Sequence, residues 1–203
     1  SVNNIDSQRD LAERDDCRGE VVQGEEATLE LLVAHEQFAE AIEPAVADLD
    51  NPATCFLPRL APLRCCFLAA IDDSWARAQA AILEPAFAPD LPPLERVVRF
   101  FRRAAERQSG PVVLGCPFGN LALELSTRDE VIRDRVRLVF EGYCRYFEQA
   151  LGEAMASGSI EIRDTAGTAR ALLAYFQGAM LLAKTHNDSR LIDELAEHAL
   201  SLI

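Results

Sequence analysis

The amino-acid sequence predicts an all-α protein, and three features support this prediction. Apolar residues recur every three or four positions through most of the chain, which is the spacing of one face of a helix. No segment shows the alternation of apolar and polar residues that a half-buried strand needs. About half of the residues are apolar (49%) and only 7% are aromatic, a composition typical of helical proteins rich in alanine and leucine.

The first third of the chain carries the weakest pattern. Residues 1–26 are polar and rich in acids, so we expect a flexible or weakly ordered lead-in. Helical spacing begins over residues 27–41. Four prolines then follow within residues 44–62. Because each proline removes a backbone donor and disfavours helix just before itself, only short helical pieces are expected there.

The remainder of the chain has a regular helical pattern. Its apolar spacing predicts a helix from about Leu63 to Pro85 and a second from Pro93 to just before Gly110. Pro93 suits a helix start, where a missing N–H costs least. A shorter helix is predicted over residues 116–126.

Three further helices are predicted towards the C-terminus. A capping box from Thr127 to Glu130 predicts the start of a long helix, and Gly158 predicts its end. Asp164 is expected to cap the next helix. Residues 191–202 are predicted to form a last amphipathic helix.

The charge distribution counts against DNA contacts by the N-terminal third. The whole chain has a formal net charge of −13. Residues 1–66 contain fourteen acids and five arginines, whereas proteins that bind nucleic acid usually present a basic patch to the phosphates. No apolar run approaches the roughly 18–20 residues of a membrane span, and no export signal is visible. We therefore expect a cytoplasmic protein that does not enter the membrane.

The sequence contains no pattern typical of catalysis or of metal binding. The six cysteines form no C-x-x-C pair and the three histidines lie far apart, so no metal is expected. Neither a G-x-S-x-G turn nor a glycine-rich phosphate loop occurs. No cofactor, no catalytic residue and no enzyme activity are expected.

Four segments carry a resemblance to a known family. They read LAAIDDSWARAQAAILEPA, GCPFGNLALELS, VFEGYCRYFEQALGEAMASGSI and ALLAYFQGAMLLAKTHND. In this order and spacing they resemble the C-terminal ligand-binding and dimerisation domain of TetR-type transcriptional regulators. The resemblance implies that residues 67–203 form that domain. It also implies a homodimeric, ligand-responsive repressor that binds operator DNA.

The resemblance weakens in the segment where such regulators carry their DNA-binding head. Residues 27–41 resemble the first helix of the family, but residues 42–66 lack the glycine-centred turn, the aromatic pair and the Ser-Lys pair that normally follow. Residues 27–66 are therefore interpreted as an atypical or degenerate helix-turn-helix head. Three hypotheses stay open: a divergent but working head, a head that has lost DNA binding, or an out-of-register stretch of the gene. The alternative function is a TetR-like dimer that binds a small molecule but not DNA.

The resemblance also implies a mostly apolar ligand pocket between the helices. Gln177 is a polar candidate for orienting a ligand there, which we expect to be small and apolar or electrophilic. The other candidate pocket residues are Trp75, Gln79, Phe101, Cys116, Phe118, Asn120, Phe140, Tyr143, Phe147, Phe176 and Lys184.

Cys116 is the candidate sensor thiol. It stands at the start of a predicted helix, where the helix dipole lowers the pKa of an exposed thiol. Lys184, the only lysine of the chain, belongs to a helix that borders the same pocket in the family fold. Two alternatives are a buried cysteine that packs as a small apolar residue and a thiol-based catalyst.

The last two predicted helices contain more apolar residues than one buried face needs. The resemblance implies that they pair with their copies across a two-fold axis in a four-helix bundle; the alternative is a monomer. The candidate interface residues are Leu172, Phe176, Met180, Leu191, Leu195, Ala199 and Leu202.

Overall fold

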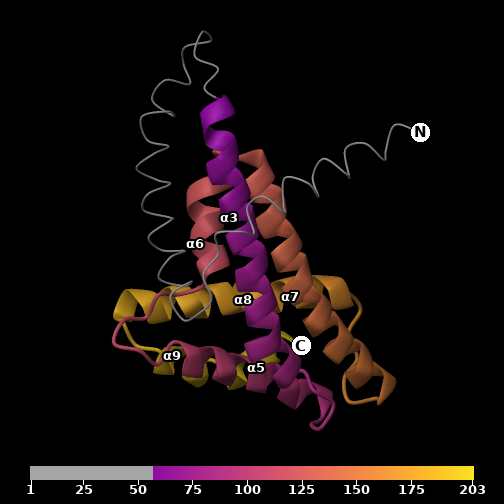
Figure 1. The fold of residues 1–203 in the computed structure, drawn as a ribbon. Coiled ribbons are helices and arrows are strands. Elements are labelled where there is room, and N and C mark those ends of the chain that lie inside the picture. Colours follow the sequence, from indigo (N-terminus) through magenta and orange to yellow (C-terminus); the bar gives the residue numbers. More distant parts are fainter. Residues whose placement is uncertain (1–56) are drawn as a thin grey trace, which may run out of the picture. The chain divides into compact units, whose positions relative to one another are not determined.

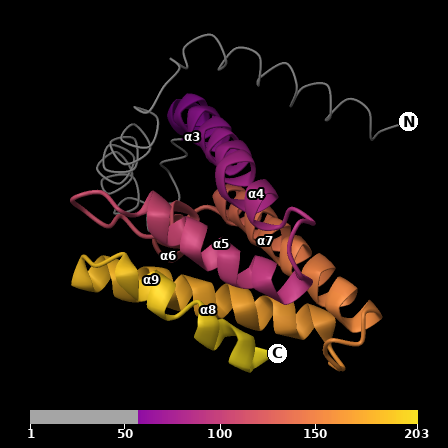
Figure 2. The same cartoon turned by 90° about the horizontal axis from the view of Figure 1, so that it is seen from below.

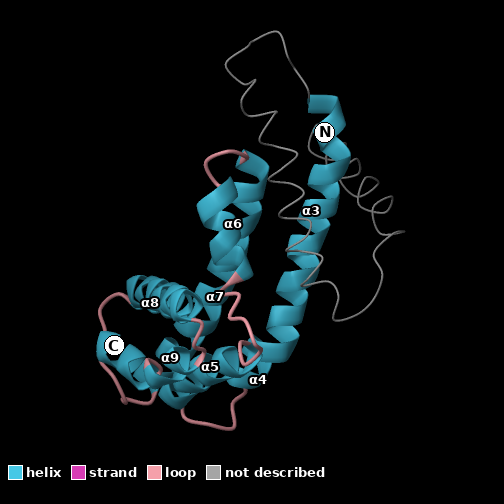
Figure 3. Ribbon diagram, turned by 90° about the vertical axis from the view of Figure 1, so that its left-hand side faces the viewer, coloured by secondary structure: helices cyan, strands magenta, loops and turns pink. Residues whose placement is uncertain are grey.

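The structure is a computed structural model that describes the backbone of residues 57–203 and the side chains of residues 67–203. Every regular element in this range is a helix (Figure 3), which confirms the predicted all-α class. The predictions made for residues 1–26 and for most of residues 27–66 lie outside the described part. None of the helices in the described part combines the length and the apolarity needed to span a membrane.

The chain divides into two compact units, Ser1–Ser74 and Trp75–Ile203. Helix α3 (Leu57–Ala78) runs across the boundary and continues as the π-helix η2 (Gln79–Leu83) and the short α4 (Glu84–Ala86). This helix begins earlier than the predicted Leu63. Pro58 falls in its first turn, where a proline breaks no helical hydrogen bond, so it does not prevent the helix from starting.

The two helices that follow agree with their predictions. Helix α5 spans Pro93–Arg107 and helix α6 spans Pro117–Leu125. Each has its proline at the first or second position, where the missing N–H would have had no partner in the helix.

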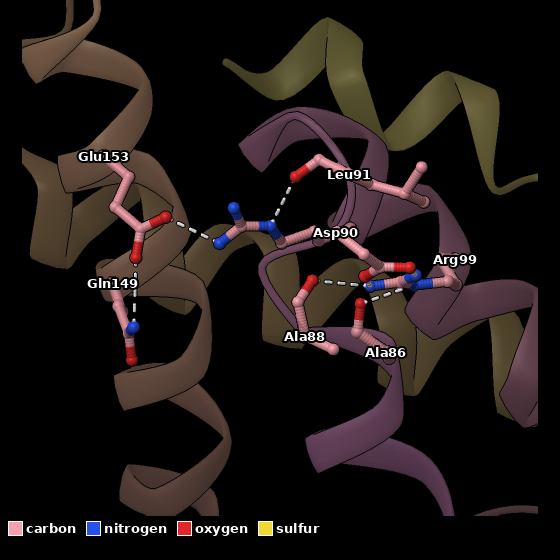
Figure 4. Close-up of polar contacts among 8 residues, drawn as sticks. Ala86, Ala88, Asp90, Leu91, Arg99, Gln149 and Glu153 are labelled. Atoms are coloured by element: carbon pink, nitrogen blue, oxygen red, sulfur yellow. Dashed lines mark hydrogen bonds and ion pairs between the residues drawn. The ribbon is translucent and has the colours of Figure 1, made fainter.

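Two arginines of α5 attach the preceding loop to the rest of the unit (Figure 4). Arg96 is 7% exposed, and it donates to the Leu91 carbonyl (2.7 Å) and to a carboxylate oxygen of Glu153 (2.6 Å). Gln149 donates to the other oxygen of that carboxylate at 3.0 Å. Arg99 makes similar attachments to the carbonyls of Ala86 and Ala88 and to the carboxylate of Asp90.

Helix α7 spans Glu130–Ala156 and is the longest of the described helices. Its N-cap is Asp129, whose carboxylate accepts the backbone N–H groups of the first turn at 2.9 and 3.0 Å. The prediction that Thr127 caps this helix was therefore wrong by two residues. Gly158 follows the helix with a φ of 72°, in agreement with its predicted role as the stop.

The C-terminal helices differ from prediction in one respect. Helix α8 spans Thr165–His186. It is capped by Asp164, as predicted, and ends at Asn187 in the left-handed conformation (φ 52°). The predicted single last helix is instead two pieces, α9 (Arg190–Glu194) and a 3-10 helix η3 (Glu197–Leu202).

Within the unit that begins at Trp75, α7 packs against α5, α6 and α8. Figure 1 shows α7 running across α8, and Figures 1 and 3 show α6 beside the beginning of α7. Helix α9 packs on both α5 and α8, as Figure 2 also shows. The candidate site described below lies between α6, α7 and α8.

The centre of this unit is filled with aromatic rings from α5, α7 and α8. The Phe100 ring centroid lies 4.6 Å from that of Phe176 and 5.3 Å from that of Phe147. The ring centroid of Tyr143 lies 5.0 Å from that of Trp75. Because buried aromatic pairs at such distances stabilise one another beyond their burial alone, these rings form the packed core.

Most of the predicted dimer-interface residues turn out to be covered within the protomer. Leu172, Phe176, Met180 and Ala199 are all buried, which corrects the face assigned to them. Leu191 and Leu195 are half-buried, and Leu202 is exposed. The outward face of α8 carries other small and apolar residues at alternating spacings of three and four: Ala171, Ala174, Gly178, Leu181 and Thr185.

Candidate ligand-binding site

The loop before α6 is held in place by two amide side chains. The Gln108 side-chain oxygen accepts the backbone N–H groups of Leu114 (3.0 Å) and Gly115 (3.1 Å). The Asn187 side-chain oxygen accepts the N–H of Val113 at 2.8 Å. Because these bonds tie the loop to the end of α5 and the end of α8, the start of α6 has a fixed position.

Cys116 is the N-cap of α6 and is 5% exposed. The Gln177 side chain donates to its Sγ atom at 3.5 Å. Burial raises the pKa of the Cys116 thiol, and this effect outweighs the hydrogen bonds from Gln177 and from the N–H groups of Gly119 and Phe118. The predicted helix start is correct. The lowered pKa expected of an exposed thiol there does not apply, because this thiol is buried.

A groove of about 320 Å³ runs between α6 and α8, with one residue of α7 also lining it. Its lining is mainly apolar, with four polar side chains at Cys116, Asn120, Gln177 and Lys184. The remaining lining residues are Gly115, Gly119, Ala122, Leu123, Phe140, Gly178, Met180 and Leu181.

The polar end of the groove is an ordered chain of hydrogen bonds. Asn120 donates to the Leu114 carbonyl at 3.2 Å, which fixes its amide. Its side-chain oxygen then accepts a proton of the Lys184 ammonium, also at 3.2 Å. Lys184 lies in the last turn of α8, where the negative end of the helix dipole favours a cation.

Two glycines make room for the polar side chains. A β-carbon on Gly115, which has a φ of 77°, would lie 3.1 Å from Cδ of Lys184. A β-carbon on Gly119 would lie 2.4 Å from the side-chain oxygen of Gln177. Larger residues at these positions would displace Lys184 and Gln177, so the two glycines determine the shape of the polar end.

A wider hollow of about 640 Å³ adjoins the groove and shares Ala122 and Phe140 with it. It is lined by charged residues of both signs, including four arginines and two glutamates. One of these arginines, Arg137, is paired with Glu141 at 2.6 Å. Because its charges are of both signs and two of its arginines, Arg133 and Arg137, are already paired with glutamates, we assign the ligand site to the narrower groove.

The structure separates the predicted pocket residues into two sets. Cys116, Asn120, Phe140 and Lys184 line the groove, together with Gln177. Gln79 does not: its amide donates to the Tyr146 hydroxyl at 3.5 Å. The other aromatic members do not line the groove either and instead have ring contacts with one another or with Phe100: Trp75, Phe101, Phe118, Tyr143, Phe147 and Phe176.

Tyr143 differs from its aromatic neighbours because it carries a polar atom into the core. It is 5% exposed, and its hydroxyl makes no hydrogen bond within the described residues. Burial holds the pKa of Tyr143 well above its usual range, and the negative charge of a Cys116 thiolate would raise it further. Tyr143 therefore stays neutral.

Several residues that build the site were not predicted from the sequence. Gln108 and Asn187 hold the loop, and Gly119 admits the Gln177 side chain. Of these residues, only the glycines could have been recognised in the sequence, because Gly115 and Gly119 stand four residues apart around a predicted helix start. Among the described residues, no three His, Cys, Asp or Glu side chains cluster in a way that could hold a metal ion.

Residues 93–199, more than half of the chain, match the family model of the tetracyclin repressor-like C-terminal domain. The chain belongs to the TetR family. The match covers α5 to α9 and most of η3, and so includes all the helices that line the groove.

Named relatives and solved structures agree with this assignment. The chain is 32% identical over 106 residues to the HTH-type transcriptional repressor DhaR of Mycobacterium sp. (strain GP1), covering 51% of this chain and 52% of DhaR. It shares the fold of a TetR regulator of Chloroflexus aurantiacus (TM-score 0.59, 22% identity, 68% of this chain and 71% of that one). It also shares the fold of reduced E. coli NemR (TM-score 0.62, 18% identity, 86% and 95%).

The TetR-family chain thus spans about half the length of the curated relative that it matches. That relative is named as a transcriptional repressor and not as an enzyme. The matched part of the chain is the part in which the groove lies.

Proposed function

We propose that this TetR-family protein is a ligand-responsive transcriptional regulator, most simply a repressor, that acts in the cytoplasm as a homodimer and has no enzyme activity. The observation that carries the proposal is the groove between α6 and α8, which lies within the segment that matches the family's C-terminal domain. A ligand changes DNA binding only if its affinity differs between two conformations of the dimer. Two-fold symmetry would then require palindromic half-sites in the operator.

The outward face of α8 supports the homodimer. Small residues at Ala171, Ala174 and Gly178 allow a second helix to approach closely, and Leu181 adds apolar area on the same face. A two-fold pairing of α8 with its copy would cover this face in both protomers.

The burial of Cys116 favours a role in lining the site over a role as an electrophile sensor. Its pKa is raised, and a thiol reacts with electrophiles through its thiolate. A thiol-based catalyst is disfavoured for the same reason.

A second function is favoured by the acidic composition of residues 1–66: a dimer that binds a small molecule but not DNA. The test is a gel-shift assay of the full chain on the DNA upstream of its own gene. A regulator would bind at low salt and lose affinity steeply as salt rises. No binding at low salt would exclude the regulator and leave the second function.

A further inference from the structure

We propose that the groove binds a small amphipathic anion, specifically a carboxylate. The carboxylate would lie against Lys184, and the apolar part would lie along Leu123 and Phe140. The proposal rests on the proposed role of the groove as the ligand site, but it does not require DNA binding.

The charge of the groove indicates that the ligand is an anion. Its lining includes one cation, Lys184, and no acidic residue, although acids outnumber bases by 33 to 20 in the whole chain. Lys184 forms no ion pair with a carboxylate of the described residues. In the neighbouring hollow, Arg133 has such a partner in Glu130 (2.8 Å) and Arg137 has one in Glu141 (2.6 Å). The groove therefore has an uncompensated positive charge of its own.

The ammonium group is also held in position. An ammonium has three protons to donate, and the Asn120 oxygen accepts one of them at 3.2 Å. The lysine stem lies against Gly115, where a β-carbon would come within 3.1 Å of it. Two protons remain for a ligand, and a carboxylate offers two oxygens to accept them.

The remaining lining explains why the anion should carry an apolar part. Leu123 is 77% exposed, so it leaves apolar surface in water beside the groove. A hydrocarbon chain laid along Leu123 and against Phe140 would cover that surface. The volume of about 320 Å³ is at the small end of ligand pockets, which are roughly 300–1,000 Å³, so the ligand should be small.

The test compares two probes that share a hydrocarbon chain and differ in charge, octanoate and octanamide. Isothermal titration calorimetry on the full-length protein at pH 7 and low salt would measure both affinities without DNA. We expect octanoate to bind about fivefold more tightly, the ratio that a partly exposed ion pair supplies. The preference should shrink at high salt because the pair is open to solvent.

Two variants of Lys184 test whether its charge causes the preference for octanoate over octanamide. Lys184→Gln keeps hydrogen-bond donors but removes the charge, so it should bind the two probes equally. Lys184→Arg keeps the charge and should keep the preference. Thermal melting of both variants would establish that they fold like the wild-type protein.

The proposal is overturned if octanoate does not bind the wild-type protein or binds no more tightly than octanamide. It is also overturned if Lys184→Gln retains the preference. A protein that fails the gel-shift test but prefers octanoate through Lys184 would lose the proposed regulatory function and keep this inference.

Discussion

At the scale of single residues, Tyr143 places a hydroxyl in the aromatic core with no partner among the described residues. A buried polar group without a hydrogen bond costs about 1–3 kcal/mol. Tyr143→Phe removes that group and keeps the ring, so it should raise the free energy of unfolding by about 1 kcal/mol, measured by urea denaturation.

Tyr175 supplies the matched control for this change. Its hydroxyl donates to the Leu195 carbonyl at 3.1 Å, so Tyr175→Phe should lower the free energy of unfolding by about 1 kcal/mol. A destabilised Tyr143→Phe protein would contradict the description of this hydroxyl.

Cys116 gives a prediction about pH. Its pKa is raised by burial, so little thiolate forms at neutral pH and the thiolate fraction grows only as pH rises through the higher value. Alkylation by iodoacetamide, followed by mass spectrometry of the Cys116 peptide, should be slower in the folded protein than in urea, and faster at alkaline pH. Rapid modification of the folded protein at pH 7 would restore the sensor hypothesis.

The polar groups that line the groove could be predicted from the sequence, but the residues that hold its loop in place could not. Cys116, Asn120 and Lys184 were predicted because each is a polar group on a helix that borders the pocket in the family fold. Gln108 and Asn187 were missed, because an amide that holds a distant loop leaves no spacing pattern in the sequence.

At the scale of elements, Arg96 attaches α5 to α7 through Glu153 and to the preceding loop through Leu91 (Figure 4). Because Arg96 is buried, Arg96→Met should lower the free energy of unfolding by about 1.5 kcal/mol, measured by urea denaturation at pH 7. Arg133→Met breaks only the exposed pair with Glu130 and should cost less than about 0.5 kcal/mol.

The effect of Arg96→Met should depend on pH. Hydrogen bonds from Gln149 and then from Arg96 lower the pKa of Glu153 below its ordinary 4.5. A lowered folded-state pKa stabilises the protein above the unfolded-state pKa, and this contribution disappears as pH falls through the folded value. The difference between wild type and variant should therefore narrow below about pH 4. A difference that stays constant down to pH 3 would contradict the assigned role of Glu153.

Helix positions were well predicted because periodic apolar residues and caps are local signals. Asp164 and Gly158 act as predicted. The capping box at Thr127 failed because the helix begins two residues later, where the carboxylate of Asp129 accepts the N–H groups of Val131 and Ile132. The π-helical turn over Gln79–Leu83 was not predicted, because the insertion of one residue barely alters the apolar pattern.

At the scale of the whole molecule, the outward face of α8 predicts the oligomeric state. Ala174→Glu should place like charges opposite one another across a two-fold axis, because Ala174 lies in the middle of that face. Dimerisation should weaken by at least about 100-fold, or about 3 kcal/mol, in sedimentation-velocity experiments.

Ala156→Glu is the control for the dimer prediction, since Ala156 is exposed at the end of α7 and does not belong to the α8 face. It should sediment as the wild-type protein does. A monomeric wild type, or an Ala174→Glu protein that remains a dimer, would contradict the assigned face.

Helix α8 has two apolar sides, and the sequence pattern does not distinguish the buried side from the outward one. A period of 3.6 residues predicts that one side of a helix is apolar, but α8 has two such sides. Leu172, Phe176 and Met180 face the core, while Ala171, Ala174 and Leu181 face outward. Only the positions of α5, α7 and α9 decide which side is already covered.

If the groove controls a DNA-binding dimer, a ligand bound in the groove must change the affinity of the protein for DNA. Fluorescence anisotropy would follow the full chain bound to the DNA upstream of its own gene while octanoate is added. Octanoate should shift the DNA affinity of the wild-type protein and should have a much smaller effect on Lys184→Gln. An equal effect on both proteins, or none on either, would contradict it.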